Sequence, residues 1–302
     1  MRLPLPSFAP VAPRLALVML CAVLAVGGCS LRFAYSQLDW LVPWYVRDYV
    51  TLDAGQRSAL DTRLAARLDW HCRAHVPAYA ASLREAQAML ARDSVDAAQL
   101  APFLARGEAW WAEILAELEP DARVLLAGLA NEQVEELRQA FARDEREKRE
   151  EFLDGSDAAQ EAARIKRMEK RLQRWFGRMT PAQRARIAAW SAELSPTTAD
   201  WLAQRVRWQG ALLDALQVRG DDAAFAARIA TLFAAQHAHW PPAYREGVAR
   251  NRTLTLTLLA DVFNLAPEAQ REHLNREIGA LAAQFESLAC AAPARLSAAL
   301  GR

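Results

Sequence analysis

Two histidines and a cysteine are the group in this sequence whose residue types and spacing suit metal chemistry. His71 and His75 stand one helical turn apart with Cys72 between them, and two histidines at that spacing can share a metal ion. No glutamate follows His71 to complete a zinc-protease motif, and the other histidines are distant in sequence, at His237, His239 and His273. We therefore expect no metal and no other cofactor, with His71 and His75 as the candidate ligands if a metal is bound.

Motifs for other catalytic chemistry are missing. The sequence holds no nucleophile motif and no glycine-rich phosphate loop. Its many acidic residues stand three or four positions from basic ones, as Glu145 does from Arg149, which is typical of ion pairs on a helix surface. We expect a protein that is not an enzyme. The alternative is an envelope enzyme or metal-binding protein whose site is assembled from residues distant in sequence.

The first 28 residues have the features of a secretory signal peptide. Arg2 and Arg14 precede an uninterrupted apolar run over residues 15–26, which is too short to span a bilayer as a helix. Small residues then lead to Cys29, and Ser30 rather than aspartate follows it. We expect Cys29 to be acylated and the protein to be sorted to the periplasmic face of the outer membrane. Acyl chains would hold it there without a membrane-spanning segment.

The charge balance excludes bulk electrostatic capture of nucleic acid. The chain has 37 Lys and Arg against 36 Asp and Glu, and removal of the signal peptide takes away only arginines. A near-neutral exported protein has no general attraction for a polyanion. The partners we expect are the membrane, through the N-terminal lipid, and a protein or lipid of the envelope.

Two cysteines remain once the signal peptide and the lipidated residue are set aside. They are Cys72 and Cys290, and in an oxidising compartment these two thiols can form a disulfide. Two buried free cysteines would look the same in sequence, so both states stay open.

Aromatic residues are dense directly after the expected lipidation site. They include Phe33, Tyr35, Trp40, Trp44 and Tyr45. Tryptophan and tyrosine favour the membrane–water interface, so this segment is a candidate membrane-interface platform. The alternative is a first helix that packs its aromatic residues into a bundle, with Pro43 starting a second short helix.

The rest of the chain predicts an all-α fold, an elongated bundle of about ten helices. Apolar residues recur at three- and four-residue spacing, while glycine and proline are sparse. We expect helix breaks near Pro77, Asp93, Pro120, Gly155, Pro196, Gly220, Pro241 and Pro267. Residues 252–258 alternate as a strand would, but Leu254, Leu258 and Val262 also form a helical stripe, so we expect a helix there.

One pattern recurs four times, each time at an expected helix start. A leucine or methionine precedes a glutamine by four or five positions, at Gln56, Gln133, Gln183 and Gln270. Asp53 and Thr180 stand three residues before a glutamine, which predicts capping boxes. Gln56 and Gln183 are 127 residues apart, and Gln133 and Gln270 are 137 apart. We infer that residues 52–153 and 179–289 are divergent copies of one helical unit.

These patterns divide the chain into four parts. The expected parts are a signal peptide at 1–28, a lipidated aromatic segment at 29–51, a first helical unit with charged connecting helices at 52–178, and a second unit at 179–302.

The connecting region is strongly charged, and its second part is basic. The basic residues are Arg164, Lys166, Arg167, Lys170, Arg171, Arg174 and Arg178. Because Ile165, Met168 and Leu172 share one helical face, this helix could lie on anionic lipid. The alternative is a core helix with a solvated outer face.

The motif Tyr-x-Gln-Leu-Asp-Trp-Leu-x-Pro-Trp-Tyr at residues 35–45 resembles the opening of an uncharacterised family of Gram-negative lipoproteins, a domain of unknown function. The resemblance extends over most of the mature chain, including Arg174-Trp175-Phe176-Gly177. It implies a family but no activity and no catalytic residues. The glutamine helix starts are similar to the Leu-Thr-x-x-Gln repeats of small periplasmic stress chaperones, which suggests a class of function. We expect an envelope interaction, scaffold or chaperone-like protein.

Overall fold

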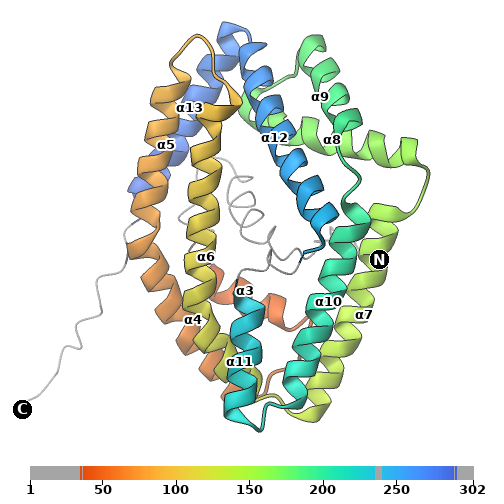
Figure 1. The fold of residues 1–302 in the computed structure, drawn as a ribbon. Helices are drawn as coiled ribbons and strands as arrows, with labels where there is room; N and C mark the ends of the chain where they lie inside the picture. Colours follow the sequence, from red (N-terminus) through yellow and green to blue (C-terminus); the bar gives the residue numbers. More distant parts are fainter. Residues whose placement is uncertain (1–34, 36, 235–239, 289, 291–302) are drawn as a thin grey trace, which may run out of the picture.

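The structure is a computed structural model that describes residues 35, 37–234, 240–288 and 290. Every regular element in these residues is a helix, so the predicted all-α fold is confirmed (Figure 1). In chain order the helices are α3 (Leu38–Val46), α4 (Ala54–Ala74), α5 (Val76–Leu90), α6 (Ala97–Ala127), α7 (Asn131–Leu153), α8 (Asp157–Phe176), α9 (Pro181–Glu193), α10 (Thr198–Gln217), α11 (Asp222–Phe233), α12 (Pro242–Asn264) and α13 (Glu268–Glu286). The strand-like segment 252–258 lies inside α12, as predicted. None of the described helices is long and apolar enough to cross a bilayer.

Side chains at the helix N-termini explain where several helices begin. At α4, Asp53 Oδ1 accepts from the backbone N–H of Gln56 at 2.8 Å, and the Gln56 side chain accepts in return at 3.0 Å. Thr180 and Gln183 form the same reciprocal pair at α9. These are the two predicted capping boxes. Asp96 starts α6 with a third capping box, outside the four glutamine motifs.

The four repeated glutamines meet in two pairs. The side-chain amide of Gln56 donates to Gln133 Oε1 at 2.9 Å, and that of Gln183 donates to Gln270 Oε1 at 2.8 Å. Gln133 and Gln270 each donate to the backbone carbonyl group five residues before the partner glutamine, at 2.7 Å. Each pair therefore fixes one helix start against another that is 77 or 87 residues away in sequence.

The helices of the two proposed units follow the same order along the chain, and helices of one unit pack on helices of the other. Helix α5 packs on α13 and α10 packs on α7, while α4 packs on α6 and α9 on α12. The place of the single helix α6 is taken in the second half by α11 and α12, which are separate helices. This order is the one that the duplication hypothesis requires. The duplication itself stays a prediction.

Three apolar clusters form the core. The first joins α8, α9, α12 and α13 through residues that include Leu172, Phe176, Ile187, Leu258 and Leu274. The second joins α7, α10 and α11 through residues that include Leu137, Phe141, Leu216, Phe225 and Ile229, with Val46 and Tyr49 packed against it. The third, which we call the disulfide cluster, consists of Cys72, Val76, Ala80, Leu281 and Phe285.

Two expectations about prolines are wrong. Helix α6 continues through Pro120 to Ala127, and Pro43 lies inside α3 instead of starting a new helix. A proline removes one backbone hydrogen bond from a helix but does not prevent tertiary contacts from holding it. In α6 the next residue, Asp121, is buried and binds Arg63 and Arg67 of α4, which holds this part of the helix in place.

Candidate functional site

Helix α3 exposes an apolar face directly after the N-terminal segment. The exposed fractions of Trp40, Leu41 and Trp44 are 55%, 36% and 40%. The two indole rings stack on each other with their centroids 6.2 Å apart. We call these three residues the α3 face. Exposed tryptophans are unusual because each indole carries a large apolar area that folding normally buries.

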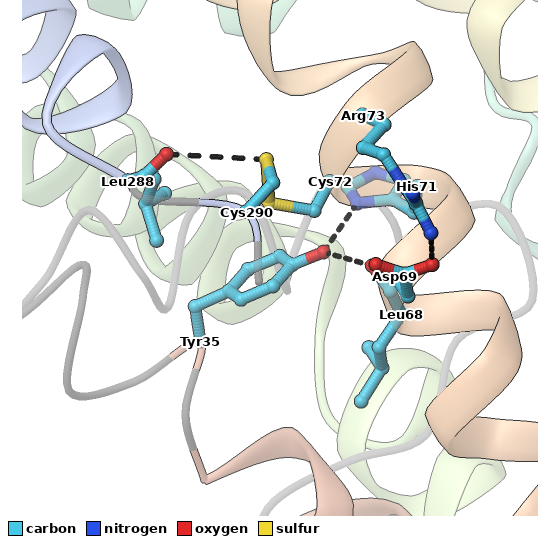
Figure 2. Close-up of a disulfide and its surroundings, with 8 residues drawn as sticks. All are labelled: Tyr35, Leu68, Asp69, His71, Cys72, Arg73, Leu288 and Cys290. Atoms are coloured by element: carbon cyan, nitrogen blue, oxygen red, sulfur yellow. Dashed lines mark hydrogen bonds and ion pairs between the residues drawn. A yellow bond between two sulfur atoms is a disulfide. The ribbon is translucent and has the colours of Figure 1, made fainter. Parts of the chain in front are cut away.

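Two other residues of the expected platform face the protein. The Tyr35 hydroxyl donates to the carbonyl oxygen of Leu68 at 2.8 Å and lies 3.1 Å from His71 Nδ1 (Figure 2). The Tyr45 hydroxyl lies 3.0 Å from that of Tyr49. Burial raises the pKa of both Tyr35 and Tyr45, so these phenols stay neutral. Of the five expected residues, Trp40 and Trp44 therefore offer an exposed surface, while Phe33, like Cys29, lies outside the described residues.

Cys72 and Cys290 are joined by a disulfide in the structure (Figure 2). The bond links the last turn of α4 to the segment after α13, across a sequence separation of 218 residues. Val76, Ala80 and Phe285 pack around it. The disulfide thus closes the contact between α5 and α13 at the end where the described chain stops.

The two candidate metal ligands are already engaged with aromatic groups. His71 Nδ1 and Nε2 each lie 3.1 Å from a hydroxyl group, those of Tyr35 and Tyr79. The His75 ring stacks against that of His71, and its Nε2 lies 3.8 Å from Glu113 Oε2, too far for a hydrogen bond. To bind a metal, His71 would have to give up a tyrosine contact. No group of three or more potential ligands occurs among the described residues.

Burial sets the protonation states of His71 and His75. It lowers the pKa of His71 to about 4, with a smaller contribution from the neighbouring His75. Burial also lowers the pKa of His75, against the opposing effect of Glu113. Both rings are therefore neutral near pH 7, and they act as aromatic packing with hydrogen-bonding capacity.

A group of buried charges lies along α7, where it packs on α10. Asp144 Oδ2 accepts from the guanidinium of Arg205 at 2.9 Å, and the side chains of both residues are about nine-tenths buried. Lys148 is only 2% exposed and donates to Glu151 at 2.7 Å. The expectation that the charges of α7 form surface ion pairs is correct for Glu145 with Arg149. It is wrong for Asp144 and Lys148, because only tertiary packing decides which face of α7 is covered.

Helix α8 resolves the alternatives left open for the basic segment. Its apolar residues Ile165, Met168, Leu172 and Phe176 pack into the first core cluster. Lys166, Arg167, Lys170 and Arg171 are exposed on the other side. The helix is thus a core helix with a charged outer face, and its apolar face is not available to a membrane.

A groove of about 620 Å³ lies between α4 and α6. Small residues of α4 line it together with Arg63, Arg67 and Asp121. The two guanidinium groups already pair with the Asp121 carboxylate. The groove therefore offers no unpaired charge to a ligand at its arginine end.

Comparison with known proteins identifies a family. The family described as a family of unknown function, DUF6279, matches residues 48–245, about two thirds of the 302-residue chain. The match supports the expected uncharacterised family, although the motif at residues 35–45 lies outside it. No curated protein and no solved structure matches the chain.

Proposed function

The chain belongs to the family of unknown function DUF6279, and from its exposed surface we propose that it is a lipid-anchored protein of the outer membrane. In this proposal it faces the periplasm and works by binding, as an envelope interaction protein with a scaffold or chaperone-like role. The lipid is attached to Cys29, and the α3 face lies against the bilayer.

The observation that carries this proposal is the α3 face. Trp40 and Trp44 expose about half of their surface on one short helix, and tryptophan is the residue that most favours the membrane–water interface. Trp40 follows Cys29 by 11 residues, and a chain of that length reaches at most about 40 Å. The α3 face is therefore within reach of a bilayer that holds acyl chains on Cys29.

The chemistry of the α3 face favours binding over catalysis. Indole and isobutyl groups supply apolar contact area but no general acid, base or nucleophile. Leaving this area in water is unfavourable by roughly 25 cal/mol per Å². The free energy therefore falls when a membrane or another apolar surface covers this face.

The anchor is tested by metabolic labelling with a radioactive or clickable palmitate in a Gram-negative host. The wild-type protein is expected to incorporate the label and to fractionate with outer membranes. The Cys29→Ser variant is expected to lose both properties. Labelling of the Cys29→Ser protein, or an unlabelled wild-type protein free in the periplasm, would refute the lipid anchor.

The α3 face is tested separately, on the mature chain with Cys29→Ser so that no lipid contributes. Sedimentation with phosphatidylcholine vesicles measures the partition coefficient of the protein. Trp40→Ala/Trp44→Ala is expected to weaken partitioning at least about tenfold, from the apolar area removed.

The matched control for the α3 face replaces two equally exposed apolar residues on other helix ends. Val124 and Leu265 are 45% and 43% exposed, so Val124→Ala/Leu265→Ala removes exposed apolar groups without touching α3. Equal losses in both double variants, or no vesicle binding by the parent protein, would contradict a role of α3 at the membrane.

A further inference from the structure

Helix α8 is rich in positive charge, and the role proposed for the α3 face does not involve this charge. Between residues 164 and 178 the sequence has seven Lys and Arg residues and a single acid, Glu169. The whole chain has a net charge of only +1. Charge of one sign is therefore gathered on this helix while the rest of the molecule balances it.

Packing arranges four of these charges as one compact patch. Because α8 buries Leu172 and Phe176 in the first core cluster, its opposite side exposes Lys166, Arg167, Lys170 and Arg171. Residues at i, i+1, i+4 and i+5 lie next to each other on a helix surface, within about 8 Å along the axis. We call these four residues the α8 patch.

The charges of the α8 patch have no ion-pair partners among the described residues. The arginines of α4 differ, since Arg57 pairs with Asp61 and both Arg63 and Arg67 pair with Asp121. In α8 the one nearby acid of the same helix, Glu169, instead accepts a hydrogen bond from the amide of Gln173. Four exposed cations thus lie together without an ion pair among the described residues, and the charge of Glu151 on α7 acts on one of them, Arg167.

The environment of Arg167 shows that these cations repel each other. Its guanidinium lies over the Phe152 ring, 5.5 Å from the centroid. Burial lowers the pKa of Arg167, and the positive charges of Arg171 and Arg164 lower it further, against the opposing effect of Glu151. A bound anion would relieve this repulsion, so the patch gains more from an anionic partner than an isolated arginine would.

We infer that the α8 patch binds the phosphate groups of anionic lipid headgroups. The four cations lie within about two turns on the solvent side of a helix that the core holds in place, and an anionic lipid surface offers laterally repeated phosphates. Each Lys or Arg near an anionic bilayer strengthens binding about fivefold. Helix α8 packs on the first core cluster, whereas α3 packs on the second. Lipid binding by the α8 patch therefore does not depend on the proposed lipid anchor or on the α3 face.

The experiment compares two kinds of vesicle with the mature chain carrying Cys29→Ser. The protein is expected to partition more strongly into phosphatidylglycerol vesicles than into phosphatidylcholine vesicles. The triple variant Lys166→Gln/Lys170→Gln/Arg171→Gln is expected to lose about 100-fold of the phosphatidylglycerol binding, from three charges at the magnitude above. Raising NaCl from about 0.05 M to about 0.5 M is expected to have the same effect on the parent protein, because salt screens the contact.

The matched control removes three exposed arginines elsewhere. Arg92, Arg245 and Arg250 are exposed on other helices or turns, so Arg92→Gln/Arg245→Gln/Arg250→Gln changes net charge equally but leaves the α8 patch intact. It is expected to keep most of the binding. Circular dichroism and urea unfolding of both triple variants establish that each is folded.

Three outcomes would overturn the inference. They are equal losses in the two triple variants, phosphatidylglycerol binding that does not respond to salt, and no preference of the parent protein for phosphatidylglycerol. The Trp40→Ala/Trp44→Ala variant separates this result from the proposed function, because it is expected to lose phosphatidylcholine binding while keeping the salt-sensitive preference for phosphatidylglycerol.

Discussion

The α5–α13 contact and the α7–α10 contact stand on opposite sides of the molecule in Figure 1 and differ in what supplements their apolar packing. The first contains an apolar cluster closed by the disulfide between Cys72 and Cys290, and the exposed ion pair of Arg84 with Glu286 also crosses it. The second contains the buried ion pair of Asp144 with Arg205 and the buried Lys148. In each contact, the second helix of one half packs on the last helix of the other half, α5 on α13 and α10 on α7.

The comparison is close because α7 and α13 begin with equivalent motifs. Leu281 and Phe285 of the disulfide cluster stand 137 residues after Asp144 and Lys148, the same spacing that separates Gln133 from Gln270. Apolar groups in one helix thus take the positions of charged groups in the other. Both contacts also bury apolar residues, so the difference teaches that one packing arrangement can be completed either by a covalent bond or by a buried ion pair.

The largest effect is expected from breaking the buried ion pair. Asp144→Ala leaves the guanidinium of Arg205 buried without its carboxylate, which costs about 3–5 kcal/mol of unfolding free energy. Urea denaturation followed by circular dichroism measures this loss. The double variant Asp144→Leu/Arg205→Met, which makes the contact apolar like that of α5 and α13, is expected to recover most of the stability. A double variant as unstable as Asp144→Ala would mean that buried charge is indispensable there.

Removal of the disulfide has the next largest effect. Cys72→Ser/Cys290→Ser, or reduction of the native protein, is expected to lower the free energy of unfolding by about 2–4 kcal/mol, because the bond closes a loop of 218 residues in the unfolded chain. Urea denaturation with and without a reductant provides the measurement. The serine variant should not respond to the reductant. An unchanged unfolding midpoint after complete reduction would show that the noncovalent contacts alone hold α5 against α13.

The stability of the protein should also depend on pH through the buried His71 beside the disulfide. The folded state holds His71 with a pKa of about 4, so as the pH falls below about 6.5 the unfolded state binds a proton first. Stability that is present above pH 6.5 is therefore lost as the pH falls toward 4. Between pH 6.5 and pH 5 we expect a loss of about 1–2 kcal/mol, measured by urea denaturation at each pH.

The control for this pH dependence is His71→Phe, which removes the titrating ring while keeping an aromatic group beside the disulfide. The variant is expected to be less stable at pH 7, since the Tyr35 and Tyr79 hydroxyls lose a partner, but its stability should fall less between pH 6.5 and pH 5. A pH response identical to that of the parent protein would assign the effect to other groups.

The smallest effect is the difference between the two glutamine pairs. Gln183 is fully buried, and its amide also donates to the Val262 carbonyl oxygen at 3.0 Å. Gln56 is more accessible to water. Gln183→Ala is expected to cost about 2 kcal/mol of unfolding free energy and Gln56→Ala about 1 kcal/mol, because water replaces lost partners only at the accessible site. Equal losses would show that the two pairs are equally desolvated.

The sequence by itself determined the features that depend on residues close together in the chain. Periodicity predicted the all-α fold, and the residues Asp53 and Thr180 marked two helix starts because a capping box needs only neighbours in the chain. The same reasoning failed at Pro120, where a tertiary contact from Asp121 to α4 outweighs the local tendency of proline to end a helix. Charge spacing on α7 likewise described surface pairs and could not show that Asp144 and Lys148 are covered.

Tertiary structure alone decided which side chains meet and which stay exposed. It turned Tyr35 toward His71 and left Trp40 and Trp44 in solvent, although all three belong to one aromatic segment. It also paired the four glutamines, whose spacing in sequence indicated a repeat but no contact. The physical reason is that burial and long-range hydrogen bonds depend on which helix faces which. That choice rests on the packing of whole apolar faces and is not encoded in the neighbours of any one residue.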